Sequence, residues 1–179
     1  MTIRLDAEEA SLGPGVLNTA EISKMKRTDL VRYLMDGGVW PFFRSLPYYD
    51  IADPNSVPPS IVVNLSDLEP FQPDPRVYLP SGSEMLLSGF EILRQLTARV
   101  VVSVHEDHDD GTWDIPGVTA YCLSGVYPAT DPGVLVYRTK TSAAEHRAWL
   151  IDGQDLLAIS RLAQTGLYPV ERVVTLAGS

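Results

Sequence analysis

The sequence predicts an α/β fold with a largely parallel sheet, and two patterns support this class. Short runs of sequence are almost continuously apolar, which is typical of strands covered on both faces. These runs occupy residues 60–65, 99–104 and 118–123. Segments with apolar residues at helical spacing lie between and after the runs. Because strands alternate with helices, we expect parallel pairing through helical crossovers.

The chain divides into two regions in this prediction. Residues 1–23 hold an N-terminal strand and a connection, because residues 2–6 alternate apolar and polar side chains as an edge strand does. Glycine and proline make residues 11–20 the connection. Residues 24–179 form the α/β domain.

Three helices follow from the spacing of apolar residues and from the residues at their ends. They cover residues 26–36, 83–96 and 154–165. The first ends at Gly37 and Gly38, because glycine adopts a positive φ at a helix C-terminus without penalty. Ser83 is the expected N-cap of the second helix. Gly166 closes the third.

The remaining segments are short strands, turns and proline-rich connections. Extended apolar sequence predicts strands at residues 149–151 and 172–176. Residues 40–44 form a short turn. Prolines make residues 45–59 and 66–82 irregular.

Composition excludes several classes of protein. The chain has 179 residues, with 14 lysines and arginines against 23 aspartates and glutamates, so its net charge is −9. An acidic chain is a poor nucleic-acid binder, because neutralising phosphates needs clustered basic residues. A single Cys122 excludes a disulfide framework, a cysteine-rich zinc site and an iron–sulfur cluster, and we expect it to be buried.

No segment is expected to insert into a membrane. The apolar runs fall far short of the ~20 residues that a membrane span needs. The N-terminus has no apolar signal-peptide core. These observations predict a cytosolic chain, or one that is peripheral to a complex on the cytosolic side.

The negative charge lies in two segments, and one of them admits a metal-site interpretation. Residues 36–75 hold six acidic residues and one basic residue, and residues 100–115 hold five acidic residues and none that is basic. Residues 105–111 (HEDHDDG) combine histidine and carboxylate ligand types, but the glutamate that a calcium loop needs further on is missing. We therefore favour a solvated turn and expect no metal ion.

Other kinds of chemistry lack their sequence signals. No G-x-S-x-G elbow supports a hydrolase nucleophile. No G-x-G-x-x-G loop supports a dinucleotide or flavin site, and bulky side chains follow Gly37 and Gly38 where a phosphate would need room. The domain is therefore expected to bind no cofactor.

Five aromatic residues within ten positions leave two interpretations open. They are Trp40, Phe42, Phe43, Tyr48 and Tyr49. Such a cluster packs in a core or forms a surface for an apolar ligand or partner. The sequence favours the core without excluding the surface.

Three stretches together resemble the A subunit of the sodium-translocating NADH:quinone oxidoreductase. Residues 36–44 (DGGVWPFFR) resemble the family's SGLW…LR segment. Residues 60–75 begin with SIVVN and end with DP, as in its SIFV…D…PLAADP passage. The tail from residue 154, with QDLLAIS, TG and RVVTLAG, is similar to its QDV.AIG…TG…R.VSLAG ending. Order and spacing agree over nearly all of residues 24–178.

One segment departs from the family. Where the family has the pattern SG.HPAG..GTHIHF, residues 124–137 read SGVYPATDPGVLVY. Tyr127 replaces the first histidine, and Leu135 and Tyr137 replace later ones. Any role of those imidazoles is therefore not expected in this chain.

The resemblance implies a Rossmann-like layered fold, related to the flavin domain of the complex I flavoprotein subunit but without its Gly-rich loop. The family subunit is longer, so we expect this chain to be a fragment containing its central domain. It implies a peripheral subunit, on the cytoplasmic side of the bacterial inner membrane, of a complex that oxidises NADH, reduces ubiquinone and exports sodium. Other subunits of that complex, above all its membrane-bound B subunit, are the expected partners.

The expected quinone or partner surface lies in the loops after Gly38 and after the strand at residues 118–123. Ligands of α/β sheets sit beyond the carboxyl ends of strands. The candidate residues are Trp40, Phe43, Arg44, Ser124, Gly125 and Tyr127. An aromatic wall with one arginine could hold a quinone ring and polarise its carbonyl. A flavin-binding redox domain and a stand-alone interaction domain are the alternatives.

Overall fold

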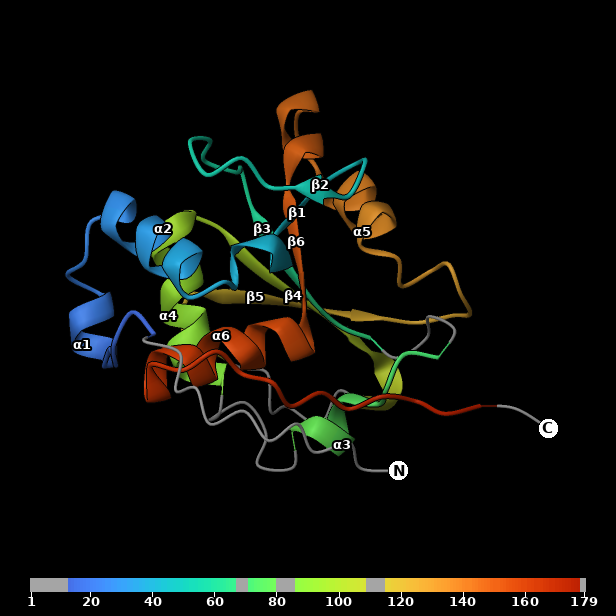
Figure 1. Cartoon of the computed structure of the whole chain (residues 1–179). Helices are drawn as coiled ribbons and strands as arrows, with labels where there is room; N and C mark the ends of the chain where they lie inside the picture. The colour runs from blue at the N-terminus through green and yellow to red at the C-terminus, as the bar shows by residue number, and fades with distance from the viewer. Residues whose placement is uncertain (1–12, 67–70, 80–85, 109–114, 178–179) are drawn as a thin grey trace.

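A computed structural model describes residues 13–66, 71–79, 86–108 and 115–177 of the chain (Figure 1). Its six strands form one sheet in the order β2-β1-β6-β3-β4-β5. The strands are β1 (Arg44–Ser45), β2 (Asp50–Ile51), β3 (Ile61–Leu65), β4 (Val100–His105), β5 (Val118–Leu123) and β6 (Trp149–Asp152). The strands from β6 to β5 are parallel, whereas β1 runs antiparallel to both β2 and β6. The predicted α/β class with a mostly parallel sheet is confirmed.

Helices cover both faces of the sheet. The α-helices are α1 (Thr19–Ile22), α2 (Arg27–Asp36), α3 (Pro75–Tyr78), α4 (Leu87–Leu96), α5 (Pro132–Thr139) and α6 (Gly153–Thr165). Short 3-10 helices are η1 (Trp40–Phe42), η3 (Glu106–His108) and η4 (Ala143–Arg147). The larger core joins one face to α1, α2, α4 and α6, and a smaller one joins the other face to α5 (Figure 1).

Alternation along the central strands explains why their sequence is almost continuously apolar. Val63 and Val102 face the larger core, and Val62 and Val101 face the smaller one. All residues of β3 and β4 are buried, so both faces of these strands need apolar side chains.

Four expectations about individual segments and residues are corrected by the structure. Residues 172–176 are extended but pair with no strand among the described residues. The connection at residues 45–59 contains most of the β1–β2 hairpin, and the one at residues 66–82 contains the short helix α3. Cys122 is exposed on β5 and is not a core residue. The expected strand at residues 2–6 and the N-cap Ser83 lie outside the described residues.

The end of α6 depends on the conformational freedom of Gly166. This residue has φ +70°, and its N–H donates to the carbonyl oxygen of Leu162 at 2.7 Å. A Cβ there would also come within 2.9 Å of the carbonyl carbon of Gly15. We expect Gly166→Ala to lower the free energy of unfolding by about 1–2 kcal/mol. Urea denaturation followed by circular dichroism measures the change.

The matched control for this prediction is Gln164→Ala, at an exposed position in the last turn of the same helix. Its effect should lie within about 0.5 kcal/mol of zero. Equal losses in the two variants would contradict a special role of the left-handed backbone at Gly166.

Candidate functional site

The connections of the sheet place a crevice beside the carboxyl ends of β3 and β6. The chain passes from β3 through α4 to β4 across one face, and from β5 through α5 to β6 across the other. These two crossovers lie on opposite faces of the sheet. The neighbouring strands β3 and β6 therefore mark the topological switch point, where the chain changes from one face to the other. In open α/β sheets this is the position where ligands bind.

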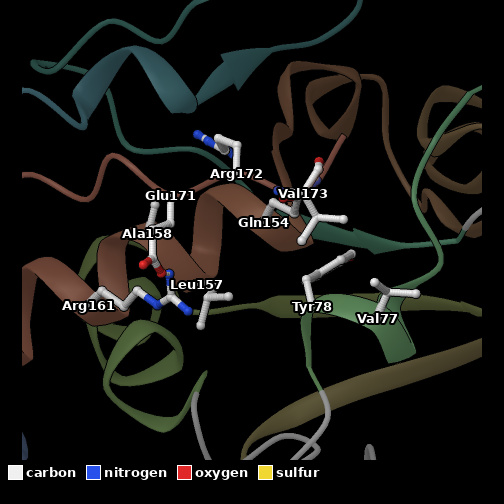
Figure 2. A pocket seen from close by; sticks show the side chains of 9 residues that line it. All are labelled: Val77, Tyr78, Gln154, Leu157, Ala158, Arg161, Glu171, Arg172 and Val173. Atoms are coloured by element: carbon white, nitrogen blue, oxygen red, sulfur yellow. Dashed lines mark hydrogen bonds and ion pairs between the residues drawn. The ribbon is translucent and has the colours of Figure 1, made fainter. Parts of the chain in front are cut away.

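A cavity of about 250 Å³ lies at this position between α3, α6 and the extended C-terminal segment (Figure 2). Its walls are formed by Val77, Tyr78, Gln154, Leu157, Ala158, Arg161, Glu171, Arg172 and Val173. At its base, a Cβ on Gly153 would overlap the side chain of Leu65 and the hydroxyl of Tyr78. A residue larger than glycine would therefore have to displace the ends of these two side chains.

Four polar contacts fasten the C-terminal segment to α6. Gln154 recognises the backbone of Val173 in both directions: its Oε1 accepts from the N–H at 2.9 Å, and its Nε2 donates to the carbonyl oxygen at 3.0 Å. Arg161 Nη1 donates to Glu171 Oε2 at 2.9 Å, and Arg172 pairs with Asp155. The segment therefore forms one wall of the crevice.

Two carboxylates make the start of α6 acidic. Asp152 is the N-cap residue, and Asp155 lies in the first turn of the helix. Burial raises the pKa of Asp155, while the neighbouring Arg172 and Arg44 act in the opposite direction. A helix N-terminus normally attracts phosphate, but two carboxylates at the same place repel it. The charged side chains that line the cavity are those of Arg161, Glu171 and Arg172, whereas neither carboxylate at the start of α6 is among its lining residues.

Among the predicted site residues, only Arg44 lies near this crevice. It acts electrostatically on Asp155 from β1, and Arg172 lies over the ring of the neighbouring Phe42 with its guanidinium carbon 4.9 Å from the centroid. Trp40 and Phe43 do not form the exposed aromatic wall that was expected, because both are buried in the core.

The five aromatic residues are divided between the two interpretations. The Trp40 indole N–H donates to the carbonyl oxygen of Ala52 at 2.8 Å, and its ring meets Trp149 edge-on at 5.6 Å. Phe42 is half-buried, whereas Tyr48 and Tyr49 are exposed. The core interpretation therefore holds for Trp40 and Phe43, whereas Tyr48 and Tyr49 lie on the surface, and a ligand or partner that binds them stays a prediction.

The other predicted residues lie at the opposite border of the sheet. Ser124, Gly125 and Tyr127 follow β5, and all three are exposed. Strands β6, β3 and β4 lie between β5 and β1, which carries Arg44. The six predicted residues therefore do not form one site, and a role of the loop after β5 in binding quinone or a partner stays a prediction.

The acidic run is only partly described by the structure. His105 is buried at the end of β4, and its Nδ1 lies 3.4 Å from Asp107 Oδ2. Within the described ranges, no group of three or more histidine, cysteine, aspartate or glutamate side chains could hold a metal ion. The expected solvated turn begins here as η3, and residues 109–111 of the run lie outside the described residues.

The contacts of Gln154, Asp155 and Arg161 with the C-terminal segment were not foreseen as a site. Both partners of the Arg172–Asp155 pair belong to the tail from residue 154 that resembles the family, so the resemblance contained a signal for this contact. Asp155 and Arg172 lie 17 residues apart in the sequence and come into contact only in the folded chain.

Comparison with known families gives a match that covers the sheet and the part of the crevice formed by α3 and α6. A family model described as the NqrA second alpha/beta domain matches residues 25–168. This chain belongs to that family. The extended segment 171–173, which closes the crevice, lies just beyond the part that the NqrA domain model describes.

Relatives of this NqrA domain are named as the A subunit of the Na(+)-translocating NADH-quinone reductase. The protein from Saccharophagus degradans is 35% identical over 160 residues, which are 89% of this chain and 36% of the relative. The one from Pseudomonas aeruginosa strain PAO1 is 34% identical over 145 residues, 81% of this chain and 32% of the relative. The chain thus spans about a third of the length of these relatives. In the part of the chain that the structure describes, no helix has the length and apolarity of a membrane span.

Proposed function

We propose that this chain is the α/β docking domain of the A subunit in a sodium-translocating NADH:quinone oxidoreductase, and that it binds no redox cofactor itself. The observation that carries the proposal is the NqrA domain match over residues 25–168, together with relatives that bear the name of that protein. In this role the domain is peripheral, on the cytoplasmic side of the bacterial inner membrane, and its main partner is the membrane-bound B subunit.

The acidic start of α6 supports a domain without a nucleotide or flavin. A Rossmann-like domain of the kind that carries flavin in complex I would place a phosphate near the switch point of the sheet. Asp152 and Asp155 occupy that place here, and the segment around Arg172 covers it. We therefore regard the fold as a relative of those flavin domains that has lost the phosphate site.

Ubiquinone is the proposed substrate of the complex, and the loop after β5 is the place where this domain could approach it. Tyr127 is 53% exposed there and offers an aromatic face beside Ser124 and Gly125. Titration of the complex with a short-chain ubiquinone should protect this loop from proteolysis. Unchanged proteolysis at saturating quinone would overturn the quinone part alone.

Purification of the complex from membranes tests the main proposal. An affinity tag on the gene product that contains this chain should recover the sodium-pumping complex, with its membrane-bound B subunit among the components. The isolated chain should be colourless. Recovery of the tagged product without any other component of the complex would overturn the proposal, and a flavin absorption band in the isolated chain would favour the redox-domain alternative.

A further inference from the structure

A second and larger cavity lies at the opposite end of the parallel strands, between the β1–β2 hairpin, the loop before β3 and η4. Its volume is about 620 Å³, within the range of about 300–1,000 Å³ that is usual for small-molecule sites. The amino ends of β3 and β6 adjoin it, because Pro59 leads into β3 and Trp149 starts β6. In Figure 1 the hairpin and the start of β6 lie away from α3 and the C-terminal segment, so this cavity is separate from the crevice.

Hydrogen bonds between distant parts of the chain hold the walls of this cavity in place. Arg27, at the start of α2, donates to the carbonyl oxygen of Pro54 at 3.1 Å and to that of Ser56. These bonds fix the loop before β3. The N–H of Leu46 donates to the carbonyl oxygen of Ala148 at 2.9 Å and ties the hairpin to the segment after η4. The fold therefore supplies the walls before any ligand binds.

Proline and aromatic rings form much of the lining of this cavity. They belong to Pro47, Tyr48, Pro58, Pro59 and Trp149. Pro58 and Trp149 are buried in the floor of the protein surface here, whereas Tyr48 is exposed. Flat apolar rings of this kind pack well against an apolar ligand body. The lining therefore favours a ligand with an apolar middle.

Two opposite charges complete the lining. Arg147 belongs to η4, and Asp53 belongs to the loop before β3. Within the described part of the chain, Arg147 has no hydrogen-bond or ion-pair partner. Asp53 Oδ1 accepts from the N–H and the side-chain amide of Asn55 at 2.9 and 3.2 Å, and Arg27 attracts Asp53 without forming an ion pair with it. A guanidinium and a carboxylate are thus available to a ligand on the walls of one cavity.

We propose that this cavity binds a small zwitterion. Its carboxylate pairs with Arg147, its ammonium group pairs with Asp53, and its apolar body lies against the proline and aromatic rings. A guanidinium holds a carboxylate through two parallel hydrogen bonds, which add geometric specificity to the attraction. A dipeptide of apolar residues has this arrangement of groups. The site goes beyond the proposed function and does not depend on it.

The pair of charges discriminates against other occupants. A phosphate-bearing ligand carries negative charge alone, so Asp53 would repel it. A segment within the same polypeptide carries no charged chain ends. It would need one acidic and one basic side chain at the right spacing to satisfy both Arg147 and Asp53. These requirements favour a free molecule that carries both charges.

Isothermal titration calorimetry of the full gene product that contains this chain tests the inference, with the dipeptide phenylalanyl-leucine as the probe. We expect a dissociation constant below about 1 mM. The N-acetyl dipeptide lacks the ammonium group and the dipeptide amide lacks the carboxylate, so each should bind at least about fivefold more weakly. Equal affinity for the three probes would overturn the inference. Absence of binding would also overturn it, as when a segment of the same polypeptide fills the cavity, and both results leave the proposed function intact.

Two variants assign the binding to this cavity. Arg147→Met removes the guanidinium but keeps an apolar stem, and it should bind the dipeptide and its amide about equally. Asp53→Asn keeps the oxygen that accepts from Asn55, and it should bind the dipeptide and its N-acetyl form about equally. Each variant should bind the dipeptide at least about fivefold more weakly than the wild type does.

Arg138→Met and Asp50→Asn are the matched controls, because both positions are exposed and neither lines the cavity. They should bind the dipeptide like the wild type. The melting temperature of each variant reports its folding. Wild-type affinity in the folded Arg147 and Asp53 variants, or an equal loss in the controls, would contradict the proposed site.

Discussion

Replacement of Trp149 by alanine is expected to lower the free energy of unfolding by about 3–5 kcal/mol. Trp149 starts β6, is 2% exposed and contacts the rings of both Trp40 and Phe43. Its removal leaves a cavity where the hairpin, the parallel strands and η1 meet, because backbone pairing keeps β6 in place beside β3 and β1. Small domains are stable by only about 5–15 kcal/mol, so this loss is a large share of the total.

Urea denaturation measures this effect, with Tyr48→Ala as the matched control. Tyr48 belongs to the same aromatic cluster of the sequence but is 83% exposed. Its replacement should change the free energy of unfolding by no more than about 0.5 kcal/mol. If the Trp149 variant lost less than about 1 kcal/mol, the packing around Trp149 would not be the rigid core described above.

The central elements of the fold could be predicted from sequence because their signals are local. The run at residues 60–65 became β3, and the apolar spacing of residues 154–165 became α6, with the expected left-handed Gly166 at its end. The segment at residues 172–176 has equally strong strand propensity, yet a strand forms only beside a partner. No described part of the chain supplies that partner, so propensity alone predicted too much.

The candidate site was less predictable because it depends on contacts between distant residues. Their closeness in the sequence shows that Trp40 and Tyr48 belong to one aromatic cluster. It does not show that Trp40 is buried and Tyr48 exposed. Spacing placed Arg44 and Tyr127 after predicted elements, but the order of strands decided that they lie at opposite borders. The partnership of Asp155 with Arg172 has no local pattern at all.

The charge on Asp155 should make the effect of Arg172→Met depend on pH. Burial raises the pKa of this carboxyl, and Arg172 opposes the shift, so the variant should have a still higher pKa at Asp155. An acid whose pKa is higher in the folded state binds its proton more tightly there, and the protein loses stability as the pH rises through that pKa. At pH ~7 we expect a loss of about 1–2 kcal/mol, reduced by solvent because the arginine side chain is 36% exposed.

Acidification should remove most of this loss. Below the pKa of Asp155 in the variant the carboxyl is neutral in the folded state, and it no longer needs the guanidinium as a partner. Urea denaturation of wild type and variant between pH ~4 and ~7 measures the difference, which should grow as the pH rises through the pKa of Asp155 in the folded wild type, which burial holds above the ordinary aspartate value. Asp155→Asn in the Arg172→Met background should abolish that growth. A loss that is equal at all pH values would instead assign the effect to the packing of Arg172 on Phe42, whose ring it also covers.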